Sequence, residues 1–106
     1  MIAESNSGPL AGVKVLEITQ MVAGPLAGTI LGDLGASVIK IEGLGGDPFR
    51  NVKPQYKDMC SHFFAVNRHK RSIRLNLKSK EGCEIARSLA AECDVVLVNS
   101  RPAAMQ

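Results

Sequence analysis

The sequence lacks the features that mark a membrane protein or a disulfide-bonded secreted protein. No apolar run approaches the roughly 20 residues that span a bilayer. The N-terminus, MIAESNSGPLAG, has no basic segment followed by an apolar one, as a secretory signal has. The three cysteines are an odd number and form no Cys-x-x-Cys pair. These absences favour reduced thiols and a cytoplasmic location.

Two signatures of catalysis and cofactor binding are also missing. No Gly-x-Ser-x-Gly elbow is present, which argues against a hydrolase of that type. The segment VAGPLAG keeps only Gly24 and Gly28 of a dinucleotide fingerprint, and Pro25 removes an N–H group that would face a pyrophosphate. Glu42 lies near the offset of a ribose-binding acid, but without the glycines it is a weak sign of NAD. The alternative is a solvated acid where a strand meets a loop.

Charge is modest but locally clustered. A net charge of +3 is too small to indicate a nucleic-acid-binding protein. Five basic residues nevertheless fall close together, namely Arg68, Lys70, Arg71, Arg74 and Lys78. They fit either a solvated charged face or a site that captures a polyphosphate. Cys60, His62 and His69 lack a fourth ligand at suitable spacing, so no metal site is expected.

Hydrophobic periodicity predicts alternating strands and helices. The expected strands lie near 13–19, 37–42, 72–77 and 94–99, and the expected helices near 25–34 and 79–92, with a short helix at 61–67 and a long loop at 43–60. Pro25 suits the first helical position, Gly35 a helix C-terminus and Ser79 an N-cap. The glycines at 24, 28 and 32 predict close packing of the first helix on the sheet.

This order of elements predicts one α/β domain with an open, mostly parallel sheet. The continuous apolar run of the fourth strand suits burial on both faces. On the packed face of the second helix we expect Ile85, Ala86, Leu89, Ala90 and Cys93. Ligands of such sheets bind at the carboxyl ends of the strands. Here those ends read QMVAGP, EGLGGDPFR, NLKS and NSRP, so four loops contribute to the candidate site.

Six segments resemble, in order, the N-terminal region of family III CoA-transferases. They are LAGVKVLEIT, AGPLAG, LGDLGASVIKIE, GGDPFR, NRHKRSIRLNLKSKEG and CDVVLVNSRP, and they cover about residues 9–102. The resemblance implies a Rossmann-like, mostly parallel open sheet that is an incomplete N-terminal portion of a larger CoA-transferase domain. Residues 1–10 are then a flexible leader, and residues 11–106 the truncated CoA-binding part.

The resemblance also implies a set of CoA contacts across the strand ends. These are Val22 and Ala23 near the thioester, Leu75, Asn76, Leu77 and Lys78 along the nucleotide end, and Asn99, Ser100 and Arg101 on the adenosine side.

Two positions depart from relatives in that family. Val22 stands where many transferases have glutamine, which leaves the acyl group open, and Gly43 stands where some have an arginine that contacts CoA. Lys78 and Arg101 are the expected phosphate partners. Lys70 and Arg71 are expected to be structural, pairing with acids such as Glu42 or Asp47.

The activity implied is transfer of CoA between carboxylic acids. Acyl-CoA and a carboxylic acid are then substrates, with no tightly bound cofactor, nucleic acid or membrane, and the full-length form is expected to be an interlocked homodimer. The family's catalytic aspartate matches no residue here, so the chain is expected to be catalytically incomplete. The alternatives are an acyl-CoA racemase of the same family, or a non-catalytic module that binds CoA, an adenine nucleotide or a protein partner.

Overall fold

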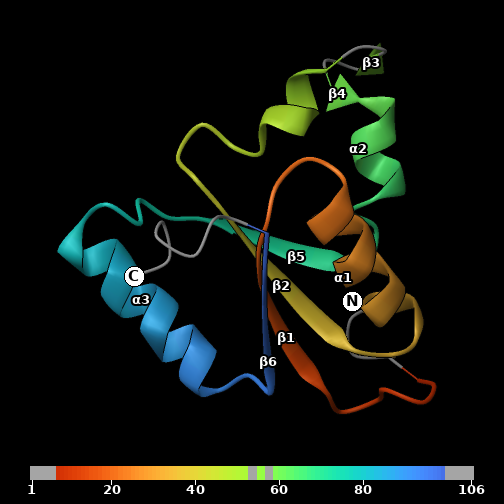
Figure 1. Ribbon diagram of the computed structural model, residues 1–106, viewed down its shortest axis with the longest axis horizontal. Helices are drawn as coiled ribbons and strands as arrows, with labels where there is room; N and C mark the ends of the chain where they lie inside the picture. Colours follow the sequence, from red (N-terminus) through yellow and green to blue (C-terminus); the bar gives the residue numbers. More distant parts are fainter. Residues whose placement is uncertain (1–6, 53–54, 57–58, 100–106) are drawn as a thin grey trace.

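The computed structural model describes residues 7–52, 55–56 and 59–99, which build a parallel sheet with helices on both faces (Figure 1). The sheet contains β1 (Lys14–Ile18), β2 (Ser37–Glu42), β5 (Lys70–Arg74) and β6 (Val95–Val98). Its strand order is β5-β2-β1-β6, and every neighbouring pair is parallel. In chain order this is third, second, first, fourth, which is the order of the first four strands of a Rossmann fold. The predicted fold class is therefore confirmed.

The helices lie close to their predicted positions, at α1 (Ala23–Asp33), α2 (Ser61–Ala65) and α3 (Lys80–Ala91). The hydroxyl of Ser79 caps α3 by accepting a hydrogen bond from the amide of Gly82 at 3.0 Å. Gly35 follows α1 with a φ of 110°, a left-handed conformation that favours glycine. α1 begins earlier than predicted, so Pro25 is its third residue. Its missing N–H is still harmless, since the first four N–H groups of a helix have no acceptor within it.

The third sheet strand begins and ends earlier than the predicted 72–77. β5 pairs with β2 from Val38 opposite Lys70 to Glu42 opposite Arg74. Because β2 ends at Glu42, the chain makes one more bond, from the amide of Leu75 to the Glu42 carbonyl at 2.9 Å, and then turns toward α3.

The long predicted loop has structure of its own. It contains a short 3-10 helix, η2 (Pro48–Asn51), and an antiparallel pair of two-residue strands, β3 (Gln55–Tyr56) and β4 (Met59–Cys60). Asp47 starts η2 by accepting a hydrogen bond from the amide of Phe49 at 2.9 Å. The prediction of one long loop over 43–60 was therefore wrong in this part.

Alternate side chains of the strands face different helices. One cluster, around Val15 and Val38, packs with Leu31 of α1. The other, around Leu16 and Ile41, packs with Leu89 of α3. In Figure 1 the two helices accordingly lie on opposite sides of the sheet.

The glycines of α1 bring its backbone close to the sheet, as predicted. A Cβ on Gly24 would lie 2.7 Å from the Cβ of Thr19. A Cβ on Gly28 would lie 1.9 Å from Oε1 of Glu17, which is shorter than any real contact. Only glycine at position 28 therefore lets α1 approach the buried Glu17 side chain.

The prediction that the fourth strand is buried on both faces was wrong. β6 is one of the two edge strands of the sheet and pairs with β1 alone among the described strands. Its side chains at Val95, Val96 and Val98 are 42%, 47% and 39% exposed. Ile85 was also expected on the packed face of α3 but is exposed. The other four residues predicted for this face, Ala86, Leu89, Ala90 and Cys93, do pack against the sheet.

Within the described residues, no helix is both long and apolar enough to cross a membrane. Of the expected leader, residues 1–6 lie outside the described part of the chain. Leu10 is attached to the end of α1, because its amide donates to the carbonyl of Leu34 at 2.9 Å.

Candidate functional site

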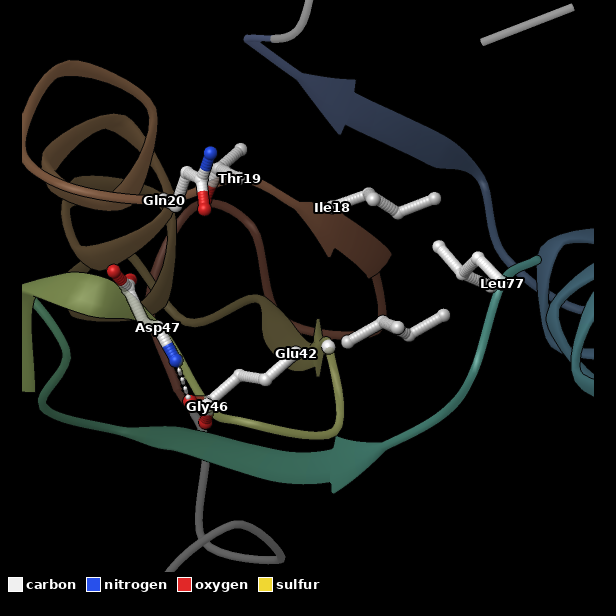
Figure 2. A pocket seen from close by; sticks show the side chains of 9 residues that line it. Ile18, Thr19, Gln20, Glu42, Gly46, Asp47 and Leu77 are labelled. Atoms are coloured by element: carbon white, nitrogen blue, oxygen red, sulfur yellow. Dashed lines mark hydrogen bonds between the residues drawn. The ribbon is translucent and has the colours of Figure 1, made fainter. Parts of the chain in front are cut away.

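A pocket lies at the carboxyl ends of β1 and β2, beside the segment that follows β5 (Figure 2). It encloses about 140 Å³ and is lined by Ile18, Thr19, Gln20, Ile41, Glu42, Gly43, Gly46, Asp47 and Leu77. Ile18 and Leu77 form an apolar side, whereas Gln20 and Asp47 lie on the other side. Sites for whole small molecules usually measure about 300–1,000 Å³. This pocket is therefore the size of one part of a larger ligand, at the edge that the sequence predicted.

The connection between β1 and α1 is held from two directions. The side-chain amide of Asn99, just after β6, donates to the carbonyl of Gln20 at 2.9 Å and accepts from its amide at 3.3 Å. From the β2 side, Oδ1 of Asp47 accepts from the amide of Met21 at 3.1 Å. Residues far apart in the sequence thus fix two consecutive residues of this loop.

Glu42, at the end of β2, is bound internally. Its carboxylate accepts from the amide of Asp47 at 2.6 Å, from Nε and Nη2 of Arg50 at 2.8 and 2.7 Å, and from the hydroxyl of Ser72. Burial alone raises the pKa of Glu42, but the hydrogen bonds from Arg50, Ser72 and Asp47 together lower this pKa to about 2. The side chain is buried, so the solvated-acid reading was wrong. The carboxylate is also committed to these partners, which argues against a ribose ligand.

A buried ionic network lies behind the pocket, between the sheet and α1. Nζ of Lys40 is 2.7 Å from Oδ2 of Asp47 and 3.5 Å from Oε2 of Glu17. Nζ of Lys70 is 2.7 Å from Oε1 of Glu17 and donates to the carbonyl of Pro25 at 2.7 Å. Burial lowers the pKa of Lys70, although the Glu17 carboxylate acts in the opposite direction. The network ties three strands and α1 to Asp47.

Sequence reasoning missed this network. Glu17 and Lys40 stand at strand positions that face α1, where an apolar residue is usual. Charged residues at such inward positions were the available signal. Lys70 is structural, as expected, but its partner is Glu17 rather than Glu42 or Asp47. Arg71 instead donates to the hydroxyl of Ser37 at 3.0 Å.

The candidate CoA-contact residues do not all lie at one place in the structure. Val22 is the N-cap of α1 and is exposed, and Ala23 begins that helix. Leu77 lines the pocket, while Asn99 is bonded to Gln20 beside it.

The remaining candidates are placed differently. The side chain of Leu75 is buried in the core under α3. Asn76 and Lys78 lie in the turn before α3, where Oδ1 of Asn76 accepts from the amide of Lys78 at 3.0 Å. Ser100 and Arg101 lie outside the described residues.

The fold and this site together define a Rossmann-like α/β protein whose ligand edge lacks the dinucleotide glycines. Comparison with protein families makes the class more specific. The family model for CoA-transferase family III matches residues 10–106. The chain belongs to CoA-transferase family III.

Individual relatives agree with this assignment. The chain is 46% identical over 100 residues to human succinyl-CoA:glutarate CoA-transferase, covering 92% of this chain and 23% of that protein. It is 43% identical over 109 residues to a probable fatty acyl-CoA transferase of Mycobacterium tuberculosis, covering 100% of this chain and 28% of that one. Among solved structures, a CaiB/BaiF family protein from Brucella suis is 41% identical with a TM-score of 0.87, covering 94% of this chain and 28% of that chain. The chain therefore spans about a quarter of the length of these relatives.

Proposed function

We propose that residues 11–106 are the CoA-binding N-terminal part of a CoA-transferase, and that CoA lies across the carboxyl ends of β1, β2, β5 and β6. The observation that supports this most strongly is the pocket at that edge, with Gln20 and Leu77 in its walls and Asn99 beside it. Three of the four loops named from the sequence line this pocket, and the fourth supplies Asn99, which is hydrogen-bonded to Gln20.

The thioester end of CoA is assigned to the start of α1. Val22 and Ala23 stand at the N-terminus of this helix, where N–H groups lack intrahelical acceptors and carry partial positive charge. Such groups can polarise a thioester carbonyl. Lys78 is assigned to a phosphate, because its side chain is exposed in the turn after β5. Arg101 is assigned a similar role from the family resemblance alone.

The reaction proposed for the whole protein is transfer of CoA from an acyl-CoA to a carboxylic acid. Relatives are named for succinyl-CoA with glutarate or malate, and for fatty acyl groups, so the acyl group is left open. Covalent transfer needs a carboxylate that is free to attack the thioester. Among the described aspartates, Asp33 pairs with Arg68, Asp47 pairs with Lys40, and Asp94 accepts from the amide of Lys14. Asp58 lies outside the described residues, but the family resemblance matches the catalytic aspartate to no residue of this sequence, so we infer that a segment outside this chain supplies the nucleophile.

Two further inferences concern the location of the protein in the cell and its assembly. We infer a cytoplasmic protein in which Cys83 and Cys93 stay as thiols, as they are in the structure. We also infer an interlocked homodimer for the full-length form. Exposed apolar side chains on α1, among them Leu26 and Ile30, support this, because a covering subunit would bury them.

Titration calorimetry of this chain with CoA and with NAD tests the proposal. We expect weak CoA binding and weaker NAD binding. Lys78→Ala should weaken CoA binding roughly fivefold through loss of one phosphate contact, whereas Lys80→Ala, two residues further along, should not. NAD binding equal to or tighter than CoA binding would overturn the assignment.

A second experiment tests the inferred absence of the nucleophile. The chain is incubated with succinyl-CoA and labelled glutarate, and labelled thioester and hydroxylamine-sensitive acyl-enzyme are measured. Neither should form. Turnover that disappears in a Glu42→Gln variant would show that this chain carries its own catalytic carboxylate.

A further inference from the structure

Met21 has an unusual backbone conformation at a sensitive position. Its φ is 70°, in the left-handed region that residues with a side chain seldom adopt. Its side chain is exposed, so core packing does not hold this conformation. Residues kept in such regions persist only where their surroundings determine them, and they gather at functional sites. Met21 also directly precedes Val22, the N-cap of α1.

Asp47 makes the hydrogen bond that holds Met21. Oδ1 accepts from the amides of Met21 at 3.1 Å and Phe49 at 2.9 Å, while Oδ2 accepts from Nζ of Lys40 at 2.7 Å. The Asp47 backbone is itself fixed, because its amide donates to the buried carboxylate of Glu42. Asp47 is 2% exposed, so little water competes for these bonds. Its two oxygens thus join the ionic network to the β1–α1 loop.

The role that this geometry indicates for Asp47 has two parts. The first concerns the conformation of Met21, and the second, which concerns a bound acyl-CoA, rests on the proposed function. We propose that Asp47 is a positioning residue, which holds Met21 left-handed and so aims the first amides of α1 at the acyl group of a bound CoA thioester. Without this bond, Met21 returns to the extended region that its side chain prefers. The amides of Val22 and Ala23 then no longer point at the acyl group, although the sheet beneath them is unchanged.

The first part is tested by NMR spectroscopy without any ligand. A left-handed residue gives a strong intraresidue contact between its amide and α protons. We expect this signal for Met21 in the wild-type chain and its loss in Asp47→Ala and, less completely, in Asp47→Asn. Ser72→Ala is the matched control, because it removes one hydrogen bond to the neighbouring Glu42 but leaves the bond from Met21 to Asp47 in place. A left-handed Met21 in both Asp47 variants would overturn the proposal.

The second part is tested by binding and by rescue. Asp47→Asn should bind succinyl-CoA about tenfold more weakly, the ratio expected when a left-handed residue loses its support, with a smaller change for free CoA. Met21→Gly should restore acyl-CoA binding in the Asp47→Asn background, because glycine adopts this conformation without strain. A merely structural role for Asp47 predicts no rescue, and that result would overturn the positioning role. If the wild-type chain binds neither ligand, the proposed function fails, and with it the acyl part of this inference, but the NMR result still decides the conformational part.

Discussion

The two faces of the sheet are built on different physical principles. Under α3 the contacts are apolar, from Leu16, Ile41 and Leu75 to Leu89 of the helix. Under α1 the same strands present an apolar cluster around Val15 and Val38, and beside it Glu17 and Lys40, which are almost fully buried. The α3 face is therefore held by the hydrophobic effect, which has no direction, whereas the α1 face adds charged groups with fixed geometry to its apolar contacts.

The difference indicates what each face does. A buried ion pair contributes little net stability, because desolvation of the charges offsets their attraction. The ionic face instead connects the sheet interior to Asp47, and through Asp47 to the loop at the ligand edge. We infer that the apolar face mainly provides stability, whereas the ionic face sets the position of the site. The variants below test this division, from the largest expected effect to the smallest.

The largest effect is expected from Glu17→Gln. This change leaves Lys70 and Lys40 buried without their shared carboxylate, and breaking such a network costs about 4 kcal/mol of unfolding free energy. Urea denaturation measures it, with the exposed Glu84→Gln as the control. A loss below about 1 kcal/mol would show that the network is not coupled to folding.

A matched pair on the other face sharpens the contrast. Leu16→Ala should cost about 3 kcal/mol, through a cavity in the apolar cluster. Leu16→Met, which keeps the volume, should cost less than about 1.5 kcal/mol. An equal loss of unfolding free energy in the two variants would mean that packing on this face depends on the exact shape of the side chain, as the ionic contacts depend on geometry.

Glu42 should make the protein sensitive to acid. Its folded pKa of about 2 lies below the ordinary value of 4.5. The stability from this difference is therefore fully present above about pH 4.5 and is lost as the pH falls toward 2, by about 3 kcal/mol in total. Denaturation measured across this range should show that slope, and Glu42→Gln should flatten it. An unchanged slope in the variant would assign acid sensitivity to other groups.

Gly28→Ala tests the close approach of α1. The new Cβ would meet Oε1 of Glu17 at 1.9 Å, so the helix must move, at a cost of about 2 kcal/mol. Gly45→Ala is the control, because a Cβ there meets nothing within 4 Å. It should be neutral or slightly stabilising, since alanine restricts the unfolded chain. A thermal melt in which the two variants behave alike would contradict the packing described.

The smallest effect on stability is expected at the outer strand. Val96 is exposed on β6, so Val96→Lys should change the free energy of unfolding by less than about 0.5 kcal/mol. An exposed apolar edge strand favours pairing between copies of a chain, so we expect the wild-type chain to self-associate and Val96→Lys to reduce that association. Analytical ultracentrifugation measures this, and association that is equal in both proteins would exclude β6 as the contact.

Local features of the sequence were sufficient to predict much of this molecule. The order of elements follows from periodicity, the cap at Ser79 from residue type, and the close packing of Gly28 from its spacing with Gly24 and Gly32. The ligand edge followed because the carboxyl ends of parallel strands share one side of a sheet. The edge position of β6 could not be predicted, because strand order depends on pairings between distant segments.

The partners of Glu42 could not be predicted either, because they also come from distant segments of the chain. Arg50 comes from η2 and Ser72 from β5, and neither is marked as a partner by its local sequence. The left-handed Met21 was equally hidden, since methionine gives no sign of that conformation. Long-range hydrogen bonds decided each of these features.

The proposed function requires that CoA occupies the carboxyl edge of the sheet. An NMR titration of the labelled chain with CoA tests this directly. We expect the largest amide shifts at Val22, Ala23, Leu77 and Lys78, and no change at Lys14, Ser37 and Arg71, which lie at the opposite ends of the strands. Shifts concentrated at those opposite ends, or no shifts at saturating CoA, would contradict it.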